Sequence, residues 1–156
     1  MAGLFKDPYK YVIDSSALFD LKQNYSPGVF KGLWDKFNRL CHDEVIISVR
    51  EVYNEIKRGS DWLIDWAEEH EKIFLKPTTV KEFKLIGELQ VREPSWVDIY
   101  SDKPAADPFV IACAKIRNLI IVQHEQPNKN LPRIAKNLGL TCYRLLDLFE
   151  AEQWEF

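Results

Sequence analysis

Apolar and polar positions along this chain follow two alternating periods. Short continuous apolar runs are typical of buried strands, whereas apolar residues three or four positions apart are typical of amphipathic helices. The runs predict strands at Tyr9–Ile13, Val45–Val49, Lys72–Leu75, Leu119–Val122 and Thr141–Arg144. Strands that alternate with helices favour a parallel sheet covered on both faces, so we expect an α/β fold with three layers, α/β/α.

Helical spacing fills most of the chain between these runs. The apolar stripes span residues 29–41, 62–67, 80–89, 109–116 and 134–138, and they include Val29, Val80 and Phe83. Gly139 is expected to end the helix before it as a C′ residue, and a last helix is expected around Leu145–Gln153. Right-handed crossovers favour the strand order 3-2-1-4-5, with the first strand in the centre and the switch point between the first and fourth strands.

Length and charge narrow the class of protein. The chain has 156 residues, which we expect to form one domain over residues 1–156. Its formal net charge is -3. A protein that coats nucleic acid along its whole surface would usually be basic, so any grip on a nucleic acid is expected to be local.

Cysteines and the distribution of charge bear on the compartment. Cys41, Cys113 and Cys142 show no CxxC spacing, so we expect three buried thiols and neither a disulfide framework nor a thiolate zinc site. Lys6 and Asp7 interrupt the start of the chain, and no apolar stretch reaches about 18 residues. We therefore expect a cytoplasmic protein with no signal peptide and no membrane span.

Acidic residues recur where the predicted strands end. The acids at these positions are Asp14, Glu51, Glu55, Asp107 and Glu125. Because parallel strands end at the same edge of a sheet, we expect these carboxylates to converge there. Like charges about 4 Å apart repel by roughly 4 kcal/mol near a protein surface, and a divalent cation removes that cost. Oxygen ligands without histidine or cysteine suit Mg²⁺ or Mn²⁺.

Structural roles can also explain these acids individually. Asp14 can be the N-cap of the helix that follows it, and Asp107 can cap the helix predicted over Pro108–Arg117, with Pro108 at N1. Glu125 can be a solvated loop residue. Caps do not explain, however, why acids recur at one edge of strands that are expected to be neighbours.

The two glutamates after the second strand are alternatives for one position in the cluster. Glu51 lies three residues after Ser48 and matches a capping box, so it has a local partner. Glu55, one turn later on the same helix face, has no such partner. We therefore prefer Glu55 as the site acid and keep Glu51 in reserve.

Four segments resemble, in order, the four motifs of PIN domains. Residues Tyr11–Leu18 resemble the first motif, an apolar strand followed by Asp and a helix start rich in small residues. Glu55–Gly59 is similar to the second, Ala106–Ala112 to the third and Val122–Glu125 to the fourth. The fourth departs from the family pattern, because Gln123 stands where Thr or Ser is usual and Glu125 stands where Asp is usual.

The resemblance covers roughly Tyr9 to Phe149 and is strongest to VapC-type toxin ribonucleases, within them to a bacterial and archaeal PIN subfamily. It implies an α/β/α PIN fold and Mg²⁺- or Mn²⁺-dependent cleavage of RNA. It also implies a toxin of a type II toxin–antitoxin system, neutralised by a cognate antitoxin, and frequent homodimerisation.

The same resemblance assigns roles to individual residues. Asp14, Glu55 and Asp107 would hold one divalent ion, which polarises a phosphoryl oxygen and lowers the pKa of a bound water. Glu125 would position that water or recruit a second ion. Ser15 or Ser16 would hydrogen-bond Asp14 or the phosphate.

Contacts to the RNA are expected from cations near the predicted site loops. The candidates are Arg50, Lys57, Arg58, Lys103, Lys129 and Arg133, although for any one of them an ordinary solvated side chain is the favoured interpretation. Trp96 and Tyr100 lie in the irregular segment Glu93–Ala106 and look exposed. They can stack unpaired bases, pack into the core or contact an antitoxin.

Two other functions remain open on the sequence. One is a PIN-like protein-binding module with weak or no catalysis, which the altered fourth motif favours. The other is a PIN nuclease that acts on DNA or on structured junctions, although such relatives generally carry more acids and a helical arch for which this chain has little room.

Overall fold

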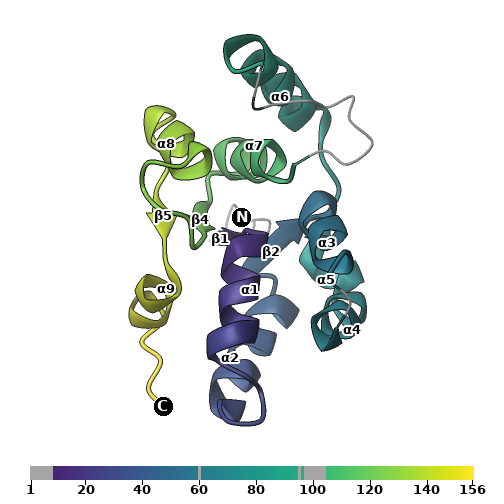
Figure 1. Ribbon diagram of the computed structural model, residues 1–156, viewed down its shortest axis with the longest axis vertical. Helices are drawn as coiled ribbons and strands as arrows, with labels where there is room; N and C mark the ends of the chain where they lie inside the picture. The colour runs from purple at the N-terminus through teal and green to yellow at the C-terminus, as the bar shows by residue number, and fades with distance from the viewer. Residues whose placement is uncertain (1–8, 60, 95, 97–104) are drawn as a thin grey trace, which may run out of the picture.

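The computed structural model describes residues 9–59, 61–94, 96 and 105–156. Within them, five parallel strands form one sheet in the order β3-β2-β1-β4-β5, which confirms the predicted topology (Figure 1). The strands are β1 Tyr11–Ile13, β2 Ile46–Val49, β3 Leu75–Lys76, β4 Ile120–Val122 and β5 Cys142–Tyr143.

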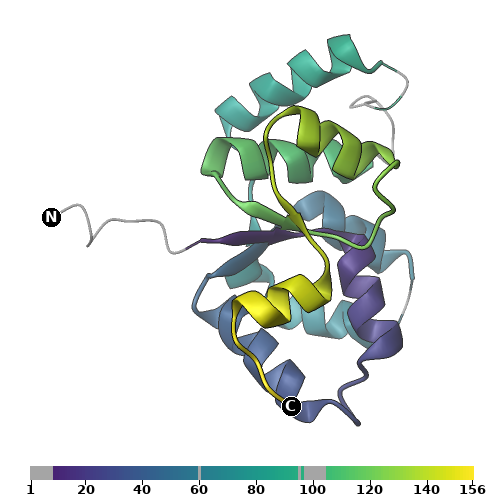
Figure 2. The same ribbon diagram turned by 90° about the vertical axis from the view of Figure 1, so that its left-hand side faces the viewer.

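Helices cover both faces of this sheet, as the three-layer prediction required. They are α1 Ser15–Asn24, α2 Lys31–His42, α3 Arg50–Lys57, α4 Trp62–Glu69, α5 Glu71–Phe74, α6 Val80–Arg92, α7 Asp107–Arg117, α8 Asn130–Asn137 and α9 Leu145–Ala151. Figure 2 shows α7 and α8 on one face and α1, α2 and α9 on the other, with α6 lying on the outer side of α7.

The central strand β1 is buried on both sides. Tyr11 pairs with Ile46 of β2 and with Ile120 of β4, so its neighbours come from both halves of the chain. Continuous apolar runs are expected in a parallel sheet that helices cover on both faces. The backbone N–H of Asp14 donates to the carbonyl of Val122 at 2.9 Å, which holds the first acid beside the end of β4.

The third predicted strand, Lys72–Leu75, is wrong over most of its length. Residues Glu71–Phe74 form the single turn α5, in which the Phe74 N–H donates to the carbonyl of His70 at 2.8 Å. Phe74 is fully buried, so the helical turn serves the core as well as a strand would. A short apolar run does not distinguish these two structures, and only Leu75–Lys76 pairs with β2.

Two predicted apolar stripes are buried only in part. Val29 precedes α2 and is exposed, and Val80 and Phe83 are exposed at the start of α6. Because α6 packs on α7 and not on the sheet, its buried apolar positions are Ile86 and Leu89. The helical period was correct, but periodicity alone did not reveal how much of each stripe a neighbour covers.

Smaller predictions of local structure have mixed outcomes. Gly139 has a positive φ of 75° directly after α8, as expected for a C′ glycine. Cys41 and Cys113 are buried thiols, but Cys142 is only half-buried because it lies on the edge strand β5. In the part of the chain that the structure describes, no helix has the length and apolar character needed to span a membrane.

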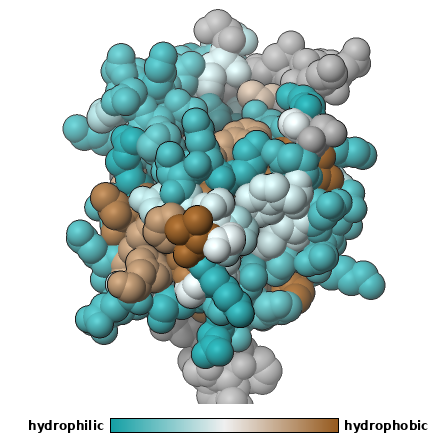
Figure 3. Space-filling view, turned by 60° about the horizontal axis from the view of Figure 1, so that its bottom comes forward, coloured by the Kyte–Doolittle hydropathy of each residue, from teal (hydrophilic) through white to brown (hydrophobic). Residues whose placement is uncertain are grey.

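The segment after α9 returns to the connection between α1 and α2. The ring of Phe149 stacks on Trp154 with centroids 5.4 Å apart and meets Tyr25 edge-on at 5.6 Å. Val29 and Phe156 remain largely exposed nearby. Figure 3 shows apolar side chains gathered on this face of the molecule among hydrophilic ones.

Candidate functional site

Asp14 lies between the end of β1 and the start of α1, and it is 1% exposed. It is the N-cap of α1, as the structural explanation predicted: Oδ2 accepts from the Ser16 N–H at 3.3 Å and from the Ser16 hydroxyl at 2.7 Å. Its second oxygen, Oδ1, is buried and has no hydrogen-bond partner among the described residues. Capping therefore accounts for one oxygen of this carboxylate and leaves the other without a partner.

Ser16 connects Asp14 to the end of β4. Its Oγ accepts a hydrogen bond from the backbone N–H of His124 at 2.9 Å while its hydroxyl hydrogen points to Asp14. The Ser16 hydroxyl thus links the ends of β1 and β4 at the switch point of the sheet. This is the position that the sequence suggested for a hydroxyl that supports Asp14.

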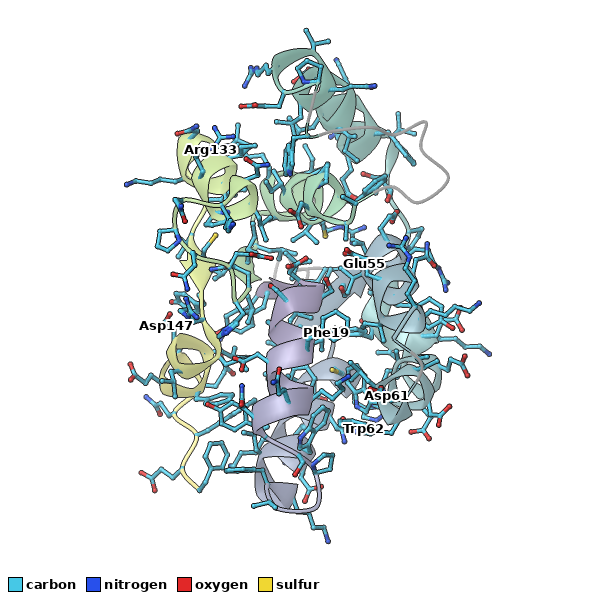
Figure 4. All side chains as sticks on the ribbon, viewed as in Figure 1. Phe19, Glu55, Asp61, Trp62, Arg133 and Asp147 are labelled. Atoms are coloured by element: carbon cyan, nitrogen blue, oxygen red, sulfur yellow. The ribbon has the colours of Figure 1, made fainter. Side chains whose placement is uncertain are left out.

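Glu55 reaches the same edge from α3. The Ser15 hydroxyl donates to Glu55 Oε1 at 3.1 Å, and the backbone N–H of Ala106 also hydrogen-bonds this carboxylate. Glu55, labelled in Figure 4, lies on the side of α3 that faces the start of α1. Segments from the first, second and third motifs therefore meet at this side chain.

Asp107 is at N1 of α7, and the prediction that it caps this helix is wrong. The N-cap is Ala106, and no side-chain capping bond is present there. The carboxylate is instead free to face the other acids. Burial, the largest cause, and the charges of Asp14, Glu55 and Glu125 together raise the pKa of Asp107 to about 7, against a hydrogen bond from the Trp96 side chain that lowers it.

The pKa values of the other acids show the same electrostatic coupling. Burial raises the pKa of Asp14, against the effect of the Ser16 hydrogen bonds, and the charge of Glu125 adds to the increase. Burial likewise raises the pKa of Glu55, and the charge of Asp14 adds to it. The fold therefore brings Asp14, Glu55 and Glu125 within electrostatic reach of Asp107.

The backbone of Glu125 is held by the side chain of Gln123. The backbone N–H of Glu125 donates to Gln123 Oε1 at 2.5 Å, and Gln123 is only 4% exposed. This side chain stands at the position of the usual Thr or Ser of the fourth motif. The two departures from the family pattern are thus in direct contact.

Glu51 lies apart from this cluster, and its predicted capping box is wrong. Val49 is the N-cap of α3 without a side-chain capping bond, and the Ser48 hydroxyl donates instead to the carbonyl of Ile13 at 2.8 Å. Burial raises the pKa of Glu51, and its charged neighbours are Arg50 and Glu82. The choice of Glu55 over Glu51 as the site acid stays a prediction, because the capping box on which it rested is absent.

The chemistry of these residues fits a hard divalent cation. All the donors are carboxylate oxygens, which Mg²⁺ and Mn²⁺ prefer, and the buried Oδ1 of Asp14 lacks a partner. Within the described residues, no three His, Cys, Asp or Glu side chains are arranged so that they could hold an ion as they stand. Binding would therefore require the carboxylates to move closer together.

The cations predicted to contact RNA differ in their availability. Arg50 forms an ion pair with Glu71 at 2.8 Å, and Arg133 pairs with Glu93 at 3.5 Å on the surface. Three others, Lys57, Arg58 and Lys129, are exposed. Lys103 lies outside the described residues, as does Tyr100.

Two contacts at the site were not predicted from the sequence. Trp96 is half-buried against the core and not exposed as expected, and its side chain hydrogen-bonds Asp107. The ring nitrogen Nδ1 of His124 lies 3.0 Å from Arg144 Nη2 and 3.2 Å from Asp20 Oδ2, so it can accept from one or donate to the other but not both. Neither contact has a local sequence signal, because each joins distant segments.

Comparison with known families shows the family to which the chain belongs. It belongs to the family described as Domain of unknown function (DUF4411), whose model matches residues 11–156. No curated protein matches the sequence.

Solved structures give the fold. The chain is similar to one from the crystal structure of VapBC2 from Rickettsia felis bound to a DNA fragment from the promoter, with a TM-score of 0.50 and 14% identity over 86% of this chain and 97% of that one. It is similar to a chain of FitAB bound to an IR36 DNA fragment, with a TM-score of 0.50 and 10% identity over 86% and 94% of the two chains. The resemblance to VapC-like PIN domains that the four motifs indicate is thus confirmed at the level of the fold.

Proposed function

We propose that this protein is a metal-dependent endoribonuclease that hydrolyses RNA phosphodiester bonds with Mg²⁺ or Mn²⁺ bound. The observation that supports this most strongly is the electrostatic convergence of four carboxylates from separate segments, centred on Asp107. Acids that only cap helices or face solvent would not need to share one buried edge. A cation shared among them would offset the cost of keeping them there.

In this proposal Asp14, Glu55 and Asp107 hold the ion, and each has a different support. Ser16 fixes one oxygen of Asp14 and leaves Oδ1 free, Ser15 orients Glu55, and Trp96 donates to Asp107. The bound ion supplies a Lewis acid for the phosphoryl oxygen and a more acidic water. Glu125 lies within electrostatic reach of Asp14 and Asp107, where its carboxylate can orient that water and accept its proton.

The biological role that we propose is the toxin of a type II toxin–antitoxin pair, with a cognate antitoxin and a possible second copy of the chain as partners. This role rests on the VapC-like motifs and on the shared fold. Growth arrest on expression of the wild-type chain, absent for an inactive variant, is the corresponding test in cells.

The direct test is cleavage of single-stranded RNA, single-stranded DNA and a flap substrate with Mg²⁺ or Mn²⁺. We expect RNA to be cut, EDTA to abolish cutting, and Asp14→Asn to lower the rate by more than about 100-fold, since even partners that only orient metal ligands are worth 10–100-fold. Preferential cutting of DNA would reassign the substrate, and cutting in EDTA would reject the metal.

Two glutamates on α3 provide a matched pair of variants. Glu55→Gln removes an acid that faces the cluster, whereas Glu51→Gln removes one that lies one turn away, beside Arg50 and Glu82. We expect a large loss of activity only for Glu55→Gln. Equal losses in both variants would show that the site is not assembled as proposed.

A further inference from the structure

A hollow of about 370 Å³ opens beside the acid cluster. It lies between the exits of β4 and β5 and the helices α8 and α9, on which Figure 4 labels Arg133 and Asp147. Its walls are formed by Gln123, Glu125, Pro127, Pro132, Lys136, Leu140, Cys142, Arg144 and Asp147. We propose that this hollow receives a nucleobase of the RNA strand next to the cleaved phosphate, and that Gln123 recognises a carbonyl oxygen on that base.

The carboxamide of Gln123 has two Nε2 hydrogens that it can donate to an occupant. The group facing it is the backbone N–H of Glu125, at 2.5 Å, and an N–H requires an acceptor. The oxygen of the carboxamide is therefore committed to Glu125, which also fixes the orientation of the amide. Gln123 lines the hollow, so Nε2 is the end of this carboxamide that can donate to a carbonyl oxygen placed there.

The rest of the lining suits a flat aromatic ring with a polar edge and a phosphate nearby. Pro127, Pro132 and Leu140 provide apolar surface, and the size of the hollow lies within the roughly 300–1,000 Å³ of small-ligand sites. Lys136 and Arg144 can contact a phosphate, and the Asp147 carboxylate can accept an N–H from the base edge. Bases in single-stranded RNA are commonly recognised by such a combination of packing and edge contacts.

The pattern of donors and acceptors selects among the bases. A carbonyl for Gln123 next to a ring N–H for a carboxylate is present in guanine and uracil and absent from adenine and cytosine. We therefore expect guanine or uracil in the hollow. We place this base next to the cleaved phosphate because Glu125 belongs both to the hollow and to the acid cluster. This placement rests on the proposed function.

Two variants of Gln123 separate recognition from general activity. Gln123→Glu keeps an oxygen for the Glu125 N–H but replaces the donors with an acceptor, and Gln123→Met keeps the length and removes both. Each variant is compared with the same change at the exposed Gln23 of α1. The measured quantity is the ratio of cleavage at different flanking bases in a randomised RNA, which does not depend on the overall rate of each variant.

We expect wild type and both Gln23 variants to prefer guanine or uracil over adenine by about tenfold, the value of one good hydrogen bond. Gln123→Met should lose the preference. Gln123→Glu should shift it towards adenine and cytosine, which carry an amino group at the ring position where guanine and uracil carry the carbonyl. An unchanged base profile in both Gln123 variants would overturn the inference while leaving RNA cleavage itself intact.

A binding measurement tests the hollow independently of catalysis. Guanosine, uridine and adenosine 5′-monophosphates are titrated into metal-free ¹⁵N-labelled protein, and the side-chain amide signals of Gln123 are identified by their absence in Gln123→Met. We expect saturable shifts with the guanosine and uridine nucleotides and at least about tenfold weaker binding of the adenosine nucleotide. Equal responses to all three, or no response, would contradict the proposal even if no RNA were cut.

Discussion

The two ends of α7 show two ways of placing a buried acid. At the C-terminal end, Glu82 of α6 is 1% exposed and forms an ion pair with Arg117 at 2.9 Å. At the N-terminal end, Asp107 faces other carboxylates, and burial together with their charges raises its pKa to about 7. The chain neutralises the first acid with its own cation and leaves the second to mutual repulsion.

This difference indicates that Glu82 has a structural role and that Asp107 does not. A buried charge is tolerated when it is paired and hydrogen-bonded, and it otherwise shifts its pKa or requires an external partner. Glu82 also completes a capping box with Thr79, so both its charge and its hydrogen bonds are satisfied locally. Asp107 has one side-chain donor among the described residues, Trp96, and three nearby acids. The N-terminal end of α7 is therefore where the proposed cation would offset the repulsion between the carboxylates.

The largest expected effect comes from breaking the paired end. Arg117→Met removes the cation and leaves Glu82 buried without its partner. We expect a loss of about 3 kcal/mol in the free energy of unfolding, the low end of the cost of breaking a buried ion pair, because Arg117 is partly exposed. Urea unfolding at neutral pH measures it.

The control for that variant is Arg133→Met, which breaks the exposed pair with Glu93. Surface pairs of this kind contribute about 0–1 kcal/mol. Equal destabilisation by the two substitutions would mean that burial does not distinguish the pairs, and the contrast between the ends of α7 would lose its physical basis.

Removing the charge of Asp107, at the N-terminal end of α7, should stabilise the metal-free protein, whereas removing Arg117 should destabilise it. The pKa of Asp107 is raised in the folded protein from 3.8 to about 7, so the folded state keeps a proton that the unfolded chain releases. Its contribution to stability is therefore present below about pH 4 and is lost as the pH rises towards 7. We expect metal-free Asp107→Asn to unfold like wild type at pH 4 and to be about 2 kcal/mol more stable at pH 8. The full three-unit shift would give about 4 kcal/mol, which partial exposure and coupling reduce.

Unfolding in EDTA at pH 4 and pH 8 measures this effect, with the exposed Asp35→Asn of α2 as the matched control. Addition of Mn²⁺ should then stabilise wild type at pH 8 and leave Asp107→Asn nearly unchanged, since a ligand stabilises only the state that binds it. If Asp107→Asn destabilised the metal-free protein at pH 8, Asp107 would be a structural acid like Glu82.

Local sequence patterns predicted much of the fold but not the hydrogen bonds between distant segments near the acid cluster. The positions of Asp14 and Asp107 follow from strand and helix starts, and the strand order follows from connection rules. The capping box at Ser48 failed because its hydroxyl reaches the carbonyl of Ile13 on the neighbouring strand, a contact that only the fold creates. The hydrogen bond between Gln123 and the Glu125 N–H was not predicted either, because no periodic pattern in the sequence indicates it.

The smallest effect is expected from a substitution of Trp96, in the segment after α6. It acts on Asp107 at the N-terminal end of α7 and leaves the Glu82–Arg117 ion pair in place. Trp96→Phe keeps a ring against the core and removes the N–H that reaches Asp107. Because that hydrogen bond lowers the pKa of Asp107, the pKa should rise above its wild-type value in the variant. Such a bond is worth about 1 kcal/mol, so Mn²⁺ binding should weaken by about fivefold. Carboxyl ¹³C NMR and Mn²⁺ titration report both, and Trp62→Phe on α4 controls for the loss of an indole. An unmoved Asp107 pKa would show that Trp96 only packs there, leaving burial and the neighbouring acids to determine the shift.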